Sequence, residues 1–358
     1  MNSNVKLATS FRLTYKLKQY EFTNVLYNDI NFNKKKILIT GGAGFIGSNL
    51  AFYFQQNFPD SEVVIFDCFR NEEYFSNGNL KSFGHYKNLI NFKGHIICGN
   101  INVKADLAKL DDYTFDFIFH HAAISDTRVN DQEIIMQTNV NTFYSLLAKT
   151  KKDGAAIVYA SSAATYGSQI SPQTIGKESP ENPYGFSKFV MDQMANKFSL
   201  DNPEISIVGL RFFNVFGPKE FYKGKTSSMI LQLGHQILSG EAPRLFDDSN
   251  KIFRDFIYIE DVIQANIKAS KPLKSGTYNI GTGVARSFQE ISDILQIELS
   301  TELGTDYFPN PYNGYQKHTQ ADISLSIENL SFKPRFSLED GIKAYIPEII
   351  DLYNLKTL

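Results

Sequence analysis

The segment Lys36–Gly47, with the sequence KILITGGAGFIG, decides the fold of this chain. Its apolar residues 37–39 are typical of a short buried strand. Three glycines, Gly41, Gly44 and Gly47, follow this strand and precede a helix-like segment. Glycines at this spacing allow a tight turn and a close approach of the main chain to a diphosphate, whose charge the helix N-terminus favours. The pattern of strand, turn and helix therefore predicts a dinucleotide-binding site.

An acidic residue follows at the distance that such folds require. A second apolar run, residues 63–66, ends at Asp67, twenty residues after Gly47. An acid at this place binds the ribose of an adenosine. We therefore predict an α/β chain with a Rossmann-type, doubly wound parallel sheet.

The residues beyond Asp67 bear on the choice of cofactor. Arg70 can pair with the 2′-phosphate of NADP, whereas the carboxylate of Asp67 would repel that phosphate. Lys87 ends the same polar and aromatic stretch and is a further candidate ligand. The prediction is NADP, with NAD as the alternative.

Further strands are expected at residues 96–101 and 115–120. The second of them runs into His121–Ser125, where small side chains let a ligand approach the backbone. His120 and His121 have no carboxylate or cysteine partner at ligand spacing, so we expect no metal site. In the expected helix 134–147, Asn139 has apolar neighbours and should make a buried hydrogen bond.

The candidate catalytic group lies in the next two elements. A strand at residues 156–159 leads into Ser162, whose hydroxyl can bind a substrate oxygen. Tyr184 and Lys188 are four residues apart and share one face of a helix. A tyrosine hydroxyl ordinarily has a pKa near 10, so it needs a neighbouring cation to act as a base near neutrality. Lys188 supplies that charge.

Composition excludes several classes of partner. The 358 residues are 42% hydrophobic, which is enough for a sizeable core. With 36 basic and 38 acidic residues the net charge is −2, so no overall field attracts nucleic acid or an anionic membrane. Cys68 and Cys98, expected to be buried or half-buried, are too few for a disulfide framework. Without a membrane span or signal peptide we expect a cytoplasmic protein, with residues 1–33 as an extension that is possibly flexible.

These motifs, in this order, resemble the extended short-chain dehydrogenase/reductase family of nucleotide-sugar enzymes. The resemblance is carried by TGGAGFIG, HHAAIS, YASSAATYG, YGFSK and RFFNVFGP. Within that family the chain most resembles the 6-epimerases of ADP-linked heptose, through residues 221–224, 244–249, 254–256, 281–288 and 315–322.

The resemblance implies an architecture and a reaction. Residues 34–216 would form the NAD(P)-binding domain, and 217–358 mostly a smaller substrate-binding lobe, with a return to the first domain around 251–285. The enzyme would invert C6 of ADP-D-glycero-β-D-manno-heptose through a transient 6-ketone, with a recycled NADP, and so supply heptose for the lipopolysaccharide inner core. A homo-oligomer is also implied.

The same resemblance assigns site residues. Lys223 would be a second acid–base group beside Tyr184, Lys188 and Ser162. Lys225 stands where the family can have a small hydroxyl residue. The implied substrate-binding residues are Ser162, Asn214, Lys225, Gln232, Phe246, Asp247, Asp248, Ser249, Arg254 and Tyr315. The predicted cofactor-binding residues are Gly41, Gly44, Phe45, Ile46, Gly47, Asp67, Arg70, Lys87, His121, Ala122, Ala123, Ile124, Ser125, Asn139, Tyr184, Lys188 and Val215.

Other activities remain as alternatives. A 4,6-dehydratase of this family would carry an acidic pair after the strand-end serine, where this chain has Ala163, Ala164 and Thr165. A UDP-hexose 4-epimerase would need Tyr184 but not Lys223, and an epimerase of a GDP-linked heptose is a further rival. A non-catalytic dinucleotide-binding scaffold is the remote alternative.

Overall fold

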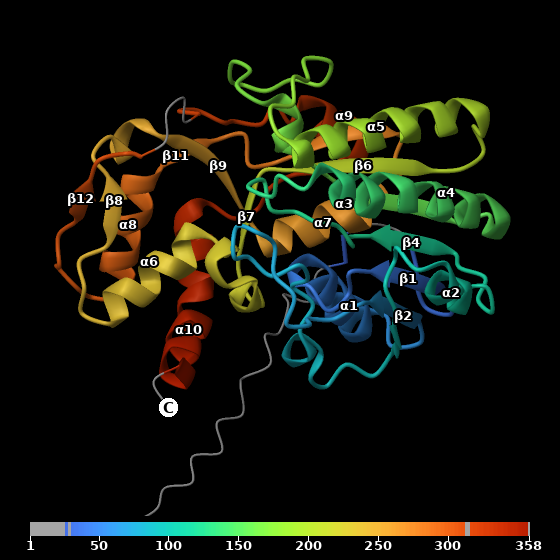
Figure 1. The fold of residues 1–358 in the computed structure, drawn as a ribbon, viewed down its shortest axis with the longest axis horizontal. Coiled ribbons are helices and arrows are strands. Elements are labelled where there is room, and N and C mark those ends of the chain that lie inside the picture. The colour runs from blue at the N-terminus through green and yellow to red at the C-terminus, as the bar shows by residue number, and fades with distance from the viewer. Residues whose placement is uncertain (1–25, 28–29, 312–315, 357–358) are drawn as a thin grey trace, which may run out of the picture.

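The computed structural model describes residues 26–27, 30–311 and 316–356. Its large lobe is built on a seven-stranded parallel sheet with the strand order β10-β6-β5-β4-β1-β2-β3 (Figure 1). The strands are β1 (Lys36–Thr40), β2 (Glu62–Asp67), β3 (His95–Cys98), β4 (Phe117–His120), β5 (Ala156–Ser162), β6 (Ile207–Phe212) and β10 (Gly276–Ile280). The doubly wound parallel sheet is confirmed.

The sheet is covered on both faces, which explains its uninterrupted apolar strands. In β1, Ile37 and Ile39 belong to one core cluster and Leu38 to the other. Helices α1 (Phe45–Asn57) and α7 (Ile259–Ala269) pack in the first cluster, whereas α4 (Thr142–Asp153) and α5 (Pro183–Asp201) pack in the second (Figure 1).

The expected helix 134–147 is interrupted. A short helix α3 (Gln132–Ile135) leads through a π-helical turn, Met136–Asn141, into α4. Asn139 lies in this turn, and its side chain exchanges two hydrogen bonds with the backbone of Ile124. The predicted buried hydrogen bond is therefore confirmed, and it fixes the loop after β4.

The small lobe follows β7 (Asn214–Phe216) and is the left-hand part of Figure 1. A three-stranded sheet in the order β11-β9-β7 and the pair β12-β8 form its strands. The elements are α6 (Met229–Leu238), β8 (Arg244–Phe246), β9 (Phe253–Tyr258), β11 (Ala285–Ser287), α8 (Phe288–Glu298), β12 (Asp306–Phe308) and α10 (Leu338–Lys356). Helix α9 (Ser324–Leu330) packs on the large lobe, where Ser326 donates to the carbonyl of Asn279 in β10. Between β9 and β11 the chain returns to the large lobe as α7 and β10.

Two expectations about the outer edge of the sheet were wrong. Strand β3 ends at Cys98 instead of running to residue 101, because the chain turns at residues 101–102, and residues 99–102 line the cavity described below. Cys68 and Cys98 are exposed, not buried, since each stands where an outer strand ends. Within the described part of the chain, no helix is long and apolar enough to cross a bilayer.

Candidate active site

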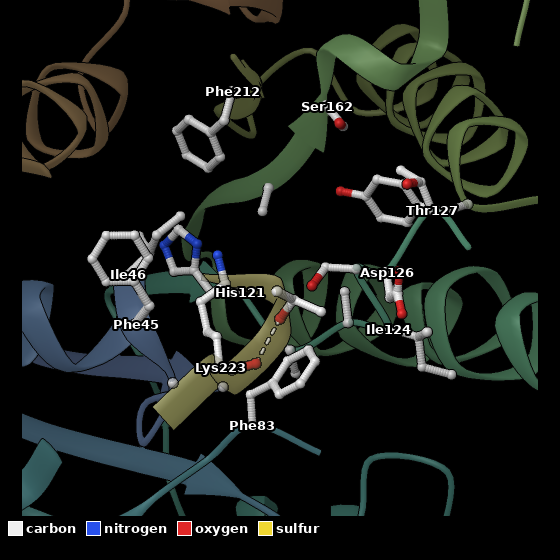
Figure 2. Close-up of a pocket in the computed structure, with 18 of the residues that line it drawn as sticks. Phe45, Ile46, Phe83, His121, Ile124, Asp126, Thr127, Ser162, Phe212 and Lys223 are labelled. Carbon is white, nitrogen blue, oxygen red and sulfur yellow. Dashed lines mark hydrogen bonds between the residues drawn. The ribbon is translucent and has the colours of Figure 1, made fainter. Parts of the chain in front are cut away.

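A cavity of about 810 Å³ opens along the carboxyl ends of the parallel strands and reaches the small lobe. Figure 2 shows Ser162, His121 and Lys223 projecting into it from three segments that are far apart in the sequence. Ser162 ends β5, His121 follows β4, and Lys223 lies in the 3₁₀ helix Phe221–Thr226 after β7. Parallel strands bring these loops together because their carboxyl ends share one edge.

The glycine turn leaves no room for side chains. Gly41 has φ +69°, and a Cβ atom there would lie 2.6 Å from the backbone nitrogen of Ala122. A Cβ atom at Gly47 would collide with the carbonyl of Gly41. Helix α1 begins at Phe45 without a side-chain cap or an acidic residue in its first turn. Its first N–H groups are thus available to a diphosphate.

Asp67 ends β2 and lines the cavity. Its carboxylate accepts hydrogen bonds from the backbone N–H groups of Ala43, at 2.9 Å, and Phe69, at 2.7 Å. Burial raises the pKa of Asp67, and these two N–H groups oppose the rise. The carboxylate is held rigidly at the edge of the cavity, as ribose binding requires.

Tyr184 and Lys188 share helix α5, as the spacing predicts, and both are buried and line the cavity. Asn182 caps this helix through a 2.8 Å hydrogen bond from the N–H of Gly185. Burial raises the pKa of Tyr184, and the hydroxyl of Ser162 opposes the rise. Burial lowers the pKa of Lys188 to about 8, and the charge of Asp192 opposes that fall.

Lys188 stands beside Tyr184 on helix α5. Its Nζ donates to the carbonyl of Ala160 at 2.8 Å and lies 5.9 Å from the centroid of the Tyr184 ring. The activation of Tyr184 by this ammonium stays a prediction.

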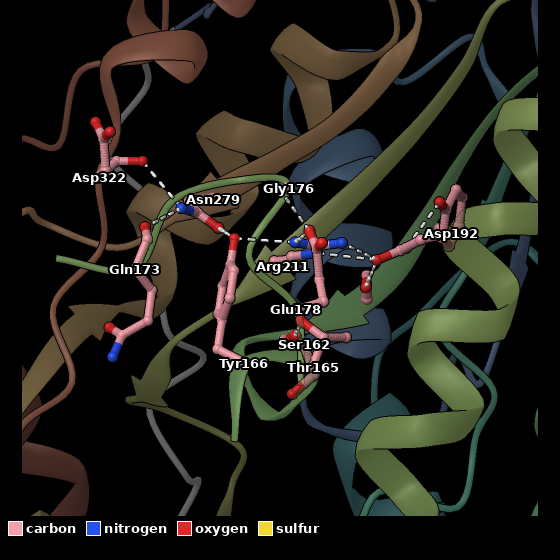
Figure 3. Close-up of polar contacts among 12 residues, drawn as sticks. Ser162, Thr165, Tyr166, Gln173, Gly176, Glu178, Asp192, Arg211, Asn279 and Asp322 are labelled. Carbon is pink, nitrogen blue, oxygen red and sulfur yellow. Dashed lines mark hydrogen bonds and ion pairs between the residues drawn. The ribbon is translucent and has the colours of Figure 1, made fainter. Parts of the chain in front are cut away.

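A buried polar network lies behind these residues (Figure 3). Asp192 accepts hydrogen bonds from Ser161, at 2.9 Å, and from the guanidinium of Arg211. Arg211 also binds Glu178 and the hydroxyl of Tyr166. The network ties the helix of Lys188 to the strand end that carries Ser162.

Lys223 also lines the cavity, and its side chain is half-buried. Its Nζ lies 5.4 Å from the centroid of the Phe45 ring. Burial lowers the pKa of Lys223, and the charge of Glu220 opposes the fall. A lysine in such surroundings can exchange a proton closer to neutrality than a surface lysine can.

The structure gathers most of the predicted residues around this cavity. All four predicted catalytic residues line it, together with Asn214 and Arg254 from the predicted substrate set. The predicted cofactor residues that line it are Gly41, Gly44, Phe45, Ile46, Gly47, Asp67, His121, Ala122, Ala123, Ile124, Ser125, Tyr184, Lys188 and Val215.

Other predicted residues do not line the cavity. Arg70 donates to the carbonyl of Tyr222, and Asn139 holds the loop of Ile124 from behind. The other predicted residues that do not line the cavity are Lys87, Lys225, Gln232, Phe246, Asp247, Asp248 and Ser249. The prediction for Tyr315 lies outside the described residues.

Several lining segments escaped the sequence analysis, among them residues 226–229 of the small lobe and two segments of the large lobe. Residues 99–102 line the cavity after β3, and the shared edge of the parallel strands was a usable signal for them. Most of residues 71–84 also line it, and this segment is anchored across the cavity because Asn77 and Asn79 donate to Asp126. Each of these hydrogen bonds joins two residues that are 47 or 49 positions apart in the sequence. The local sequence carries no signal for a contact over such a distance.

His121 lines the cavity directly after the end of β4. Burial lowers the pKa of His121 to about 4, so its ring is neutral near pH 7. The described residues contain no group of three or more His, Cys, Asp or Glu side chains that could hold a metal ion.

Residues 37–281 match the model of the NAD dependent epimerase/dehydratase family. The chain belongs to this family. The ADP-L-glycero-D-manno-heptose-6-epimerase of Brachyspira hyodysenteriae is 35% identical over 318 residues, which cover 86% of this chain and 96% of that protein.

Solved structures of family members have the same fold. The crystal structure of Helicobacter pylori ADP-L-glycero-D-manno-heptose-6-epimerase superposes with a TM-score of 0.83 at 47% identity, covering 91% of this chain and 99% of that chain. The UDP-glucuronic acid 4-epimerase of Bacillus cereus, a point mutant solved with NAD and a fluorinated UDP-sugar, has a TM-score of 0.75 at 27% identity. That match covers 89% of this chain and 100% of the Bacillus chain.

Proposed function

We propose that this chain is an epimerase that inverts C6 of the heptose in ADP-D-glycero-β-D-manno-heptose, through a 6-ketone, to give the L-glycero form. The observation that carries the proposal is the meeting of two acid–base groups in one cavity: Tyr184, buried in the large lobe, and Lys223, half-buried in the loop after β7. The heptose epimerases of Brachyspira and Helicobacter, similar over most of their length, support this choice of substrate.

A nicotinamide dinucleotide fits the residues present. The uncapped start of α1 would hold the diphosphate, and Asp67 would hold the adenosine ribose. When bound, the nicotinamide supplies the acceptor and later the donor of the hydride, with no net redox change. We keep NADP as the proposed form and NAD as the alternative. Lys81 lines the cavity and Arg70 does not, so Lys81, paired with Glu73 at 3.1 Å, is a second candidate for a 2′-phosphate.

The protein's own groups perform the proton transfers. One of Tyr184 and Lys223 removes the proton of the C6 hydroxyl as the hydride leaves. After the sugar turns, the other returns a proton to the ketone oxygen as the hydride arrives on the opposite face. Ser162, which lines the cavity, would donate a hydrogen bond to the same oxygen.

Arg254 gives the small lobe a cation for the nucleotide diphosphate. It stands on β9, is buried, and lines the cavity. Its guanidinium is oriented by the carbonyls of Phe253, at 2.8 Å, and Gln316, at 2.6 Å. A guanidinium fixed in this way suits the planar geometry of phosphate oxygens.

The proposed substrate is tested by incubating the purified protein with ADP-D-glycero-β-D-manno-heptose and following the C6 configuration by NMR. Mass spectrometry of the denatured protein identifies the released cofactor. Conversion to the L-glycero isomer with NADP released supports both parts of the proposal. Activity on a UDP- or GDP-linked sugar instead would contradict the choice of substrate, and release of NAD alone would contradict NADP.

A variant of Lys223 distinguishes the proposed 6-epimerase from the rival UDP-hexose 4-epimerase. In Lys223→Ala we expect epimerisation to fall ~10²-fold or more, because one acid–base group is lost. The matched control is Lys197→Ala, an exposed lysine of α5, which should retain wild-type activity. Undiminished activity in Lys223→Ala would overturn the two-base mechanism.

The cellular context completes the proposal. The product would supply heptose for the lipopolysaccharide inner core, and the protein would act in the cytoplasm as a homo-oligomer. Light scattering coupled to size-exclusion chromatography tests the oligomer, and a monomer at assay concentrations would contradict it.

A further inference from the structure

The loop that carries Lys223 is closed on itself by one buried side chain. Glu220 has no exposed surface. Its carboxylate accepts hydrogen bonds from the N–H of Gly217, at 3.3 Å, and from the N–H and hydroxyl of Ser228, both at 2.6 Å. The two partners stand at the ends of residues 217–228. Lys223 lies between them, and its own N–H donates to the carbonyl of Glu220 at 2.9 Å.

The same loop forms part of the cavity wall. Thr226, Ser227 and Ser228 line the cavity beside Lys223. Ser228 is also the N-cap of α6, where its side chain accepts from the N–H of Leu231. The carboxylate of Glu220 therefore fixes both the lysine loop and the start of the helix that follows it.

The hydrogen-bond pattern favours the ionised form of Glu220. Three donors converge on its two oxygens, which suits a carboxylate. Burial raises the pKa of Glu220, whereas Lys223 and the groups of Ser228 lower it. Because charge acts strongly across a dry interior, Glu220 and Lys223 stabilise each other's ionised forms without direct contact.

Other titratable groups face this carboxylate. Tyr345 and Glu348 approach from α10, and Lys219 precedes Glu220 in the loop. Burial raises the pKa of Glu348 to about 7, and its carboxylate accepts from the N–H of Lys219 at 2.7 Å. Burial lowers the pKa of Lys219 to about 7, with Glu348 opposing the fall.

We propose that Glu220 is the positioning residue of the second acid–base group, holding the loop that aims Lys223 into the cavity and supplying the negative charge that faces it. This inference rests on the proposed role of Lys223. Burial lowers the pKa of Lys223, which disfavours its charged form, and a neutral amine cannot return a proton to the ketone. With the carboxylate nearby, Lys223 can both accept and return a proton, as an inversion run in both directions requires.

The test compares Glu220→Gln with Asp261→Asn. Asp261, on α7 and outside the cavity lining, is also buried and accepts from the N–H groups of Arg335 and Phe336, so it controls for the loss of a backbone-holding carboxylate. In Glu220→Gln we expect kcat to fall ~10²-fold with KM little changed. The limb of the pH–rate profile set by Lys223 should move to lower pH, because Glu220 raises the pKa of that lysine. Neither change is expected in Asp261→Asn.

A conservative variant separates charge from geometry and remains informative if Glu220→Gln fails to fold. Glu220→Asp keeps the charge but shortens the reach to Gly217 and Ser228, so the pH limb should stay in place while kcat falls. A Glu220→Gln profile that matches Asp261→Asn, or a shifted limb in Glu220→Asp, overturns this inference alone. Full activity in Lys223→Ala overturns the two-base mechanism and this inference together.

Discussion

The guanidinium of Arg70 donates a hydrogen bond to the carbonyl of Tyr222, the residue before Lys223. The ring of Tyr222 also stacks on His85, with 3.7 Å between the ring centroids. The segment after Asp67 thus supports the loop that carries Lys223. Arg70 thus connects the segment that follows β2 to the loop of Lys223.

Replacement of Arg70 tests which of its two roles matters. We expect Arg70→Ala to lower kcat about tenfold by loosening the Lys223 loop, and to weaken NADP and NAD binding to a similar, small extent. Cofactor titration by fluorescence, together with steady-state kinetics, measures both effects. Selective loss of NADP binding would instead make Arg70 a ligand of the 2′-phosphate.

Tyr184→Phe removes one of the two acid–base groups while keeping the ring that lines the cavity. We expect kcat to fall by ~10²–10⁴, with the bound cofactor retained. Tyr144→Phe, at a tyrosine of α4 that is 61% exposed, is the control and should behave as wild type. Tyr184→Phe with more than a tenth of wild-type kcat would show that another group serves as the base.

Activity should depend on the charge of Lys188. Since burial lowers its pKa to about 8, the ammonium is present below that pH and is lost as the pH rises through it. A rate that needs this charge must therefore fall above pH 8. In Lys188→Arg, whose guanidinium stays charged, the remaining activity should show no such fall. A basic limb that is unchanged in Lys188→Arg would assign it to another group.

The buried network of Figure 3 should contribute strongly to stability. Arg211→Met leaves the buried carboxylates of Asp192 and Glu178 without their cation, and we expect the free energy of unfolding to drop by about 3–5 kcal/mol. Arg244→Met breaks the exposed pair with Asp306 and should cost less than about 1 kcal/mol. Urea unfolding monitored by circular dichroism measures both. Equal losses in the two variants would argue against a structural role for the network.

The 71–84 segment should slow the escape of the cofactor. Removing its two anchors to Asp126 in the double variant Asn77→Ala/Asn79→Ala should raise the rate of cofactor dissociation about tenfold. The rate is measured by exchange of bound cofactor against a labelled excess. Asn329→Ala, which removes an exposed amide of α9 outside the cavity lining, is the control. Identical exchange rates in the double variant and wild type would rule out a retaining role.

Local sequence patterns were sufficient to predict the elements that hold the proposed site residues. The glycine turn, the strand ending at Asp67 and the pair Tyr184 and Lys188 on one helix are each encoded within a few residues, and the structure contains all three. The interruption of the 134–147 helix was not visible, because a π-helical turn differs from an α-helix by one extra residue and leaves the apolar pattern almost unchanged.

The sequence by itself determined the parallel sheet, the dinucleotide turn and the identity of the acid–base side chains, since these depend on hydrophobic period and residue type. Only the tertiary structure decided which carbonyl accepts the hydrogen bond of Arg70 and which carboxylate holds the two ends of the Lys223 loop together. It also decided the distance between Lys188 and the ring of Tyr184. These relations join segments that meet only when the sheet and the small lobe have packed. Their charges are then set by burial, which a residue type alone does not specify.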